Sequence, residues 1–408
     1  MKQRVVITGI GAITPLGLNT EEFWQGLVEG RSGVDYITLF DVRSFPVKIA
    51  AEVKNFDPGK FMPLKRADRN GRAAQFAIAA ARMAVDSARL DLSRENRERI
   101  GVVIATTGMP AMNAEYADII KNKPARLDPL FMIKSGQCMV SSQVGLELGV
   151  KGVNTTFNCA CASGSDALGE ALNFLQLGHA DVILAGGAEA GVNLVALATC
   201  SRVGALAKDA NPARASRPFD LNRTGFVMGE GAGILVLETF EHAKQRGAPI
   251  LAEMAGVSWS FDAFNETAPD AEQEAVAMRN AIKNAGVSCA EIDCINAHGT
   301  GTKLNDSTET KAIKMAFGEM AYRIPVSSNK SMIGHLATAA GAVEAVATVL
   351  TINRGFIPPT INYETCDPEC DLDYVPNQAR QKAVNTCLSN SFGMGGQNCC
   401  IVIKRFKE

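Results

Sequence analysis

One cysteine in this sequence has the surroundings needed for nucleophilic catalysis. Cys161 follows a short β-branched segment, 155–157, and precedes a stretch with helically spaced leucines, 163–177. A thiol at the start of a helix faces unpaired backbone N–H groups and the positive end of the helix dipole, which favour the thiolate and lower its pKa. Cys159 lacks this benefit because it lies on the expected strand. The pattern predicts Cys161 as a nucleophile, although an arbitrary cysteine is more often a buried core residue.

Two of the four histidines lie where small neighbours would let a substrate approach. His298 follows a short apolar run and opens the Gly- and Thr-rich loop 298–302. His335 precedes an Ala- and Gly-rich stretch with helical spacing, 337–352. A helix N-terminus disfavours the imidazolium, so we expect His335 to be a neutral hydrogen-bond donor, which polarising a carbonyl requires.

The hydrophobic pattern predicts an α/β scaffold for these residues. Short apolar runs bounded by Gly or polar residues predict buried strands, and Ala-rich stretches with helical spacing alternate with them. The clearest strands are expected at 4–8, 100–105, 182–185, 234–237 and 400–403, and the clearest helices at 74–87, 163–177, 270–285 and 337–352. Gly247-Ala248-Pro249 marks the most plausible boundary, which divides the chain into 1–248 and 249–408. No internal repeat is visible in the sequence.

Charge and hydropathy exclude several kinds of partner. The 408 residues include 41 Lys and Arg and 43 Asp and Glu, so no global field attracts nucleic acid or an anionic membrane. The longest apolar tract, 180–200, is interrupted by charged and polar residues, so it lacks the unbroken apolar run of about 20 residues that spans a bilayer. No targeting segment is visible at the N-terminus. We therefore expect a cytoplasmic protein that binds neither nucleic acid nor membrane.

The cysteines and glycine clusters argue against a metal or nucleotide site. An odd number of cysteines, eleven, in a long chain without a visible secretory signal favours free thiols over a disulfide framework. None of them has the paired spacing of a zinc site. Gly9 and Gly11 follow an expected strand, but the third glycine of the dinucleotide fingerprint is missing after them. The glycine cluster 229–233 precedes an expected strand, whereas a phosphate-binding loop follows a strand and opens a helix. No metal is expected.

Five motifs, in order along nearly the whole chain, resemble the elongating β-ketoacyl-[acyl carrier protein] synthases. They are the Cys161 segment and the stretches 216–233, 298–302, 329–335 and 390–396. The resemblance implies the thiolase fold, an α/β fold in which two similar halves form an α-β-α-β-α layered sandwich. Cys161 from the first half and both histidines from the second half would then meet at its centre. It also implies a dimer.

The resemblance assigns catalytic roles to these residues. Cys161 would take an acyl chain from a carrier-protein thioester, and its backbone N–H together with that of Met394 would form the oxyanion hole. Malonyl-carrier protein would then lose CO2. His298 and His335 would stabilise the resulting enolate, which attacks the acyl-cysteine.

Supporting roles follow from the same resemblance. Lys330 and Glu309 would form an ion pair that tunes the site. Thr267, Thr300 and Thr302 would contact the phosphopantetheine arm. No cofactor is implied, because the substrates arrive on the phosphopantetheine of acyl carrier protein.

A basic stretch is the candidate docking surface for the acidic carrier protein. Lys65, Arg66 and Arg69 lie in it, and similar basic residues serve this role in the family. A solvated helix face is the alternative explanation of this stretch.

Within the family, the Cys-His-His set favours decarboxylative elongation. A biosynthetic thiolase would need a second cysteine in the stretch 393–398, which has none, and the initiating synthases use Asn where His335 stands. A silent scaffold or chain-length subunit would be the alternative from another class, but the intact Cys161 argues against it.

Three departures favour a specialised enzyme over a housekeeping fatty-acid synthase. Met394 stands where the family usually has a gating phenylalanine beside the nucleophile, and Phe392 would belong to the same acyl gate. Asn265 stands where histidine is common. The stretch 134–138, which ends at Cys138 and shapes the acyl pocket in relatives, is more polar than expected. These features favour the catalytic subunit of a type II polyketide synthase, which pairs with a homologous chain-length factor. A homodimeric fatty-acid elongation synthase is the alternative.

Overall fold

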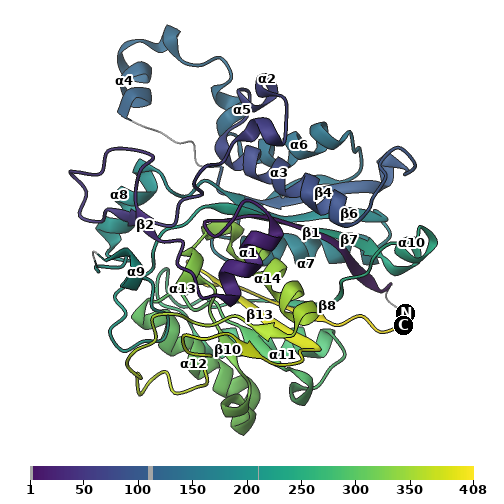
Figure 1. Ribbon diagram of the computed structural model, residues 1–408, viewed down its shortest axis with the longest axis vertical. Coiled ribbons are helices and arrows are strands. Elements are labelled where there is room, and N and C mark those ends of the chain that lie inside the picture. Colours follow the sequence, from purple (N-terminus) through teal and green to yellow (C-terminus); the bar gives the residue numbers. More distant parts are fainter. Residues whose placement is uncertain (1–2, 109–113, 210) are drawn as a thin grey trace.

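The computed structural model describes residues 3–108, 114–209 and 211–408, and their main strands form one continuous ten-stranded sheet (Figure 1). In spatial order the strands are β5 (Asn154–Phe157), β4 (Ile100–Ala105), β6 (Val182–Glu189), β7 (Gly231–Thr239), β1 (Val5–Ile13), β8 (Ala252–Phe261), β14 (Gln397–Lys404), β13 (Thr386–Gly393), β9 (Cys294–Asn296) and β10 (Val326–Ser327). All five strands predicted from apolar runs are present.

The sheet consists of two halves with the same topology. In the first half β4 pairs in parallel with β5 and β6, and β7 runs antiparallel between β6 and β1. In the second half β9 pairs in parallel with β10 and β13, and β14 runs antiparallel between β13 and β8. The halves join where β1 pairs with β8 at Val6↔Glu253 and Ile7↔Ala252. The predicted pair of similar halves is confirmed, although the sequence shows no repeat.

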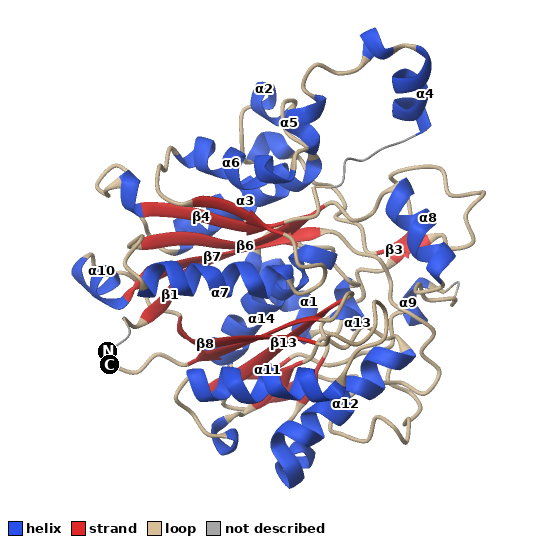
Figure 2. Ribbon diagram, turned by 180° about the vertical axis from the view of Figure 1, so that it is seen from behind, coloured by secondary structure: helices blue, strands red, loops and turns tan. Residues whose placement is uncertain are grey.

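Helices complete a five-layer sandwich (Figure 2). The outer face of the first half is covered by α3 (Arg72–Ser87) and α6 (Gln137–Leu148), and that of the second half by α11 (Ala271–Asn284) and α12 (Lys303–Phe317). Between the two halves lie α7 (Ser163–Gln176) and α14 (Ala340–Arg354), which contact strands of both. The α-β-α-β-α arrangement implied by the resemblance is therefore confirmed.

The remaining elements are short and peripheral. Two small sheets pair β2 (Asp35–Tyr36) with β3 (Ile49–Ala50) and β11 (Phe356–Ile357) with β12 (Arg380–Gln381). The other α-helices are α1 (Thr20–Val28), α2 (Leu64–Ala67), α4 (Ala114–Asn122), α5 (Phe131–Ser135), α8 (Leu194–Val203), α9 (Pro212–Ala215), α10 (Phe240–Gln245) and α13 (Lys330–Ile333). Among the described helices, none is long and apolar enough to cross a membrane.

Small residues let the two central helices approach closely. A Cβ atom on Gly164 of α7 would lie 2.7 Å from the backbone nitrogen of Ala342 of α14, so only glycine fits there. The first thirteen residues of α14 are all buried, and most of them are apolar or small. This contact matters for the site, because Cys161 precedes α7 and His335 precedes α14.

One buried carboxyl on α11 gives a prediction about stability. Glu274 is fully buried, and neither of its carboxylate oxygens has a hydrogen-bond partner within the described residues. Burial, followed by the nearby carboxylates of Glu309 and Asp262, raises the pKa of Glu274 well above its usual value of 4.5. Since the folded pKa exceeds the unfolded one, the stability present below about pH 4.5 is lost as the pH rises above it.

We expect Glu274→Gln to be more stable than the parent protein at pH 8, by about 1–3 kcal/mol in the free energy of unfolding. At pH values below the unfolded pKa both side chains are neutral, so the two proteins should then differ little. Chemical denaturation of both proteins at pH 8 and at about pH 3.5, which is below the unfolded pKa, measures this. An equal difference at both pH values would contradict the assignment to ionisation.

Candidate active site

Cys161 lies in a tight turn between β5 and α7. Ala160 adopts a left-handed conformation with φ 48°, and the Ser163 hydroxyl closes the turn. Its oxygen accepts the N–H of Cys159 at 2.7 Å and donates to the carbonyl of Ala160 at 2.5 Å. The turn fixes the half-buried Cys161 thiol on the wall of a cavity.

The electrostatics of Cys161 differ from the sequence-based expectation. Burial raises the pKa of its thiol, and this effect outweighs the backbone N–H of Met394 and the charge of Lys330, which lower it. The expected depression of the pKa at the helix start is therefore wrong, because the thiol is removed from water. The N–H groups of Met394 and of Cys161 itself both interact with the sulfur. These are the two groups expected to bind an oxyanion.

The two histidines face each other beside the thiol. The ring centroids of His298 and His335 are 5.4 Å apart, with the rings nearly perpendicular at 84°. Burial, together with the charge of Lys330, lowers the pKa of His335 to about 3 and holds the pKa of His298 well below 6.5. His335 Nδ1 accepts the backbone N–H of Ala337 at 3.3 Å, so its proton is on Nε2. Both rings are neutral, as predicted for His335, but burial is the main cause.

Glu309 holds the turn that carries His298. Its Oε1 accepts the N–H of His298 at 2.8 Å, and its Oε2 accepts the N–H of Gly299 at 2.7 Å. The side-chain amide of Asn390 donates to Oε1 at 3.1 Å. Burial raises the pKa of Glu309 to about 7, although these three donors lower it.

The prediction that Lys330 pairs with Glu309 is wrong, because Lys330 pairs with another glutamate. The Lys330 ammonium pairs with Glu344 of α14, and both side chains are only 1% exposed. Lys330 is the first residue of α13 and its ammonium reaches Glu344 on α14, whereas the Glu309 carboxylate is already bound by backbone N–H groups. The pair places a positive charge near Cys161 and both histidines, and this charge lowers the pKa of each of them.

Removing one member of this buried pair should be costly. We expect Lys330→Met to lower the free energy of unfolding by about 3–5 kcal/mol, because Glu344 would be left buried without its partner. The double variant Lys330→Met/Glu344→Leu should recover most of that loss. Urea denaturation of the single and double variants measures both values. A double variant as unstable as the single one would contradict the pair as the cause.

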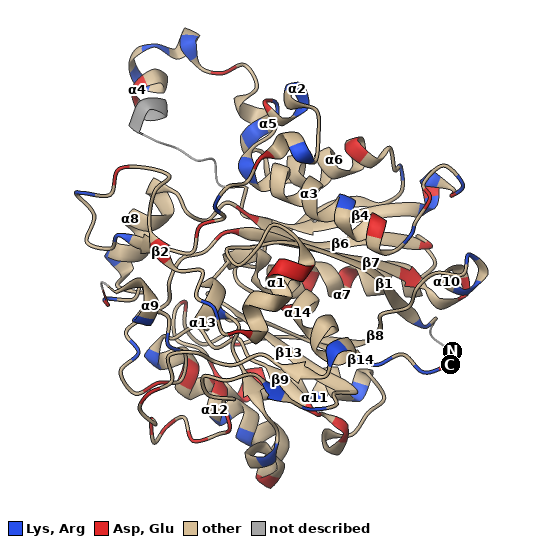
Figure 3. Cartoon of the chain, in the orientation of Figure 1, with Lys and Arg blue, Asp and Glu red and all other residues tan. Residues whose placement is uncertain are grey.

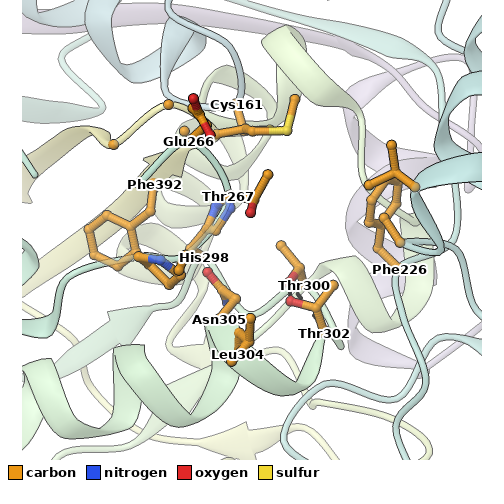
Figure 4. Close-up of a pocket in the computed structure, with 18 of the residues that line it drawn as sticks. Cys161, Phe226, Glu266, Thr267, His298, Thr300, Thr302, Leu304, Asn305 and Phe392 are labelled. Atoms are coloured by element: carbon orange, nitrogen blue, oxygen red, sulfur yellow. Dashed lines mark hydrogen bonds between the residues drawn. The ribbon is translucent and has the colours of Figure 1, made fainter. Parts of the chain in front are cut away.

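A cavity of about 410 Å³ connects the catalytic candidates to the surface. Cys161, His298 and His335 line it, together with Thr300 and the other residues predicted around them: Thr267, Thr302, Phe392, Met394 and Asn265. Figure 4 shows Cys161 on one side of the cavity and Thr302 and Leu304 on the opposite side. Leu304 and Met394 are 62% and 65% exposed, so they mark its mouth.

Other predicted residues lie away from this cavity. Cys138 is exposed on α6 and is not among the lining residues. Lys65 on α2 and the following Arg69 are exposed on the outside of the first half, where Figure 3 shows basic residues. Arg66 is half-buried and pairs with Glu147, which also pairs with Arg82, so its side chain is already held in an ion pair. The predicted docking surface therefore has two free basic side chains among these three.

The structure adds residues that sequence reasoning missed. The ring of Phe226 lies 5.3 Å from that of His335, centroid to centroid, and contributes to the cavity wall. Lys303, Leu304 and Asn305, at the start of α12, also line the cavity. Because Lys303, Leu304 and Asn305 directly follow the predicted Thr302, their place beside the cavity could have been predicted from the sequence.

Comparisons with known proteins cover the full length of the chain. The family profiles described as "Beta-ketoacyl synthase, N-terminal domain" and "Beta-ketoacyl synthase, C-terminal domain" match residues 2–243 and 251–364. A 3-oxoacyl-[acyl-carrier-protein] synthase 2 of Synechocystis sp. is 44% identical, over 100% of this chain and 99% of its own length.

Two solved structures are also similar over their whole length. The ishigamide ketosynthase/chain length factor is 40% identical with a TM-score of 0.94, and the alignment covers 100% of both chains. A type II polyketide synthase ketosynthase, solved with its acyl-carrier protein and bound to the hexaketide, is 35% identical with a TM-score of 0.88 over 100% of both chains. The thiolase fold expected from the sequence is thus the fold of solved ketosynthases.

Proposed function

This chain belongs to the β-ketoacyl synthase family and is a carbon–carbon bond-forming acyltransferase of the 3-oxoacyl-[acyl carrier protein] synthase type. On this basis we propose that Cys161, His298 and His335 carry out its decarboxylative Claisen condensation. The observation that carries the proposal is the meeting of one thiol and two neutral imidazoles on one cavity. An acyl group would be transferred first, and malonyl-carrier protein would then be decarboxylated and joined to it.

In the acylation step the nucleophile is the sulfur of Cys161. It attacks the thioester carbonyl of the acyl carrier, and the N–H groups of Cys161 and Met394 stabilise the oxyanion. The attack forms the bond between the Cys161 sulfur and the acyl carbon, and collapse of the intermediate breaks the carbon–sulfur bond to the carrier. The proton lost by Cys161 leaves on the carrier thiol.

In the condensation step the two histidines act as neutral donors. His298 and His335 donate hydrogen bonds to the malonyl thioester oxygen, so negative charge can develop there as CO2 leaves. The enolate carbon attacks the acyl carbonyl on Cys161 and forms the new carbon–carbon bond. The Cys161 thiolate is released and takes up a proton. This proton comes from solvent, and apart from it these steps use only groups of the chain and its two substrates.

Mass spectrometry tests this proposal directly. After incubation with an acyl-carrier protein, the peptide containing Cys161 should gain the mass of the acyl group, and added malonyl-carrier protein should discharge it as a β-ketoacyl product. A silent scaffold would gain no mass at Cys161, and this result would overturn the proposal.

For the finer function, we propose a polyketide-type ketosynthase that pairs with a homologous chain-length-factor subunit and receives its substrates from acyl carrier protein in the cytoplasm. The similarity to a ketosynthase/chain length factor structure supports this proposal. The homodimeric fatty-acid synthase is the alternative, and the 44% identity to the Synechocystis 3-oxoacyl-[acyl-carrier-protein] synthase 2 supports it. The exposed Lys65 and Arg69 would attract the acidic carrier. Co-purification with a homologous partner, or with a second copy of itself, separates the two assemblies.

Met394 gives a prediction about chain preference. Because Met394 is flexible, polarizable and at the cavity mouth, it should admit β-keto chains that a rigid phenylalanine gate restricts. We expect Met394→Phe to shift the ratio of kcat/KM values at least about fivefold toward saturated acyl carriers, which corresponds to roughly 1 kcal/mol. The exposed Met315 on α12 is distant from the lining residues, so Met315→Phe is the control. Identical preferences in Met394→Phe and the parent would sink this idea.

A further inference from the structure

The charged side chains along the cavity are unevenly distributed. Asp262 and Glu266 contribute two carboxylates, and Lys303 is the one Lys or Arg among the described residues that line it. Asp262 is buried and accepts hydrogen bonds from the amide of Asn398 at 2.6 Å and the N–H of Asp270 at 3.1 Å. Figure 4 shows Glu266 on the side of Cys161. Asp262 is therefore the one buried carboxylate among the described lining residues, whereas Glu266 and Lys303 are both exposed.

Lys303 lies at the mouth of the cavity. It is the first residue of α12, it is exposed, and it stands between Thr302 and the exposed Leu304. None of the ion pairs found among the described residues includes its ammonium. The ammonium acts only at longer range on Asp367, where its positive charge helps to lower the pKa of the carboxyl. An ammonium at the mouth of a substrate cavity is thus free to meet an anion on the substrate.

The proposed reaction fixes where the anionic part of the carrier arm must lie. The thioester has to reach Cys161, His298 and His335, and the pantetheine amides then pass Thr300 and Thr302. The phosphate is attached to the far end of the arm, next to the carrier protein. We infer that it leaves the cavity beyond Thr302, where Lys303 follows.

We propose that Lys303 binds the phosphate of the phosphopantetheine arm and thereby makes the enzyme prefer phosphorylated arms over plain pantetheine. This inference rests on the proposed function, since it extends the same substrate outward by one group. A lysine is a compact point charge that suits a phosphate. The site is exposed, so the contribution is moderate, about three- to tenfold in kcat/KM.

The test compares two small substrates that differ only in the phosphate, acyl-phosphopantetheine and acyl-pantetheine. The measured quantity is the preference, defined as kcat/KM for the first divided by kcat/KM for the second. We expect Lys303→Met to lower this preference about three- to tenfold, and Lys303→Glu to lower it further. An acidic residue in the first turn suits the helix dipole, so Lys303→Glu should leave α12 intact. Lys311→Glu, at an exposed position of the same helix, is the matched control.

Several results would overturn the proposal. An unchanged preference in both Lys303 variants would do so, as would an equal fall in Lys311→Glu, which would indicate a general field effect. Arg202 is exposed at the end of α8, next to the lining residue Val203. If Arg202→Met lost the preference and Lys303→Met kept it, the phosphate would be assigned to Arg202. Turnover of acyl-pantetheine by the parent protein reports on the proposed function separately, because that substrate carries no phosphate.

Discussion

Replacing Cys161 with alanine is expected to lower the rate of condensation by at least about a thousandfold, because no acyl-enzyme can form. Other thiols cannot substitute. Neither of the neighbouring thiols, Cys159 and Cys200, is among the residues that line the catalytic cavity. Product formation from acyl- and malonyl-carrier proteins measures the rate, and the mass of the Cys161 peptide measures acylation.

Cys159→Ala is the control for this experiment. Cys159 lies two residues before Cys161 on the same turn, and its thiol faces a different cavity, together with Asp166 and Trp259. We expect this variant to keep most of the condensation activity. If Cys161→Ala still condensed at a substantial rate, or if Cys159→Ala lost acylation, Cys161 would not be the nucleophile.

The second large effect concerns the two histidines and the decarboxylation step. We expect His298→Ala and His335→Ala each to lower CO2 release from malonyl-carrier protein about 10²- to 10³-fold, because each removes one neutral donor from the developing enolate. Acyl transfer to Cys161 should continue in both variants, since its oxyanion is bound by backbone N–H groups. His179→Ala, at an exposed position after α7, is the control.

The pH dependence of CO2 release provides a further check on the histidines. The pKa of His335 is about 3 and that of His298 lies well below 6.5, so neither ring gains a proton as the pH falls from 8 to 6. The rate should therefore show no histidine titration in this range. A fall in rate with a midpoint near pH 6.5 would contradict the neutral assignment if the fall disappeared in His298→Ala or His335→Ala.

Much of the fold could be predicted from hydrophobic pattern. Apolar runs such as 100–105 and 234–237 are buried on both faces of the sheet, and this environment requires the uninterrupted apolar sequence that was visible. The identical topology of the two halves could not be predicted in this way. Backbone hydrogen bonds define strand order and direction, and many different apolar sequences satisfy the same pairing, so the halves need not resemble each other residue by residue.

The site was predictable at the level of motifs and less so at the level of partners. Cys161, His298 and His335 stand out because small residues and element ends surround them. Lys330 was identified, but its partner Glu344 was not, since the contact depends on how α13 packs against α14. The pKa of Cys161 was predicted in the wrong direction, because a local pattern reports the helix start and does not report removal from water.

The position of β1 between β7 and β8 has a consequence for biosynthesis. Both neighbours of this N-terminal strand lie more than two hundred residues later in the chain, in 231–239 and 252–261. At about 5–20 residues per second, a ribosome needs roughly ten seconds or more to supply them. During that time the apolar strand 5–13 has neither of its native strand partners, so the nascent chain is a natural client for chaperones that bind exposed apolar segments. Such long-range pairing also predicts slow refolding from denaturant.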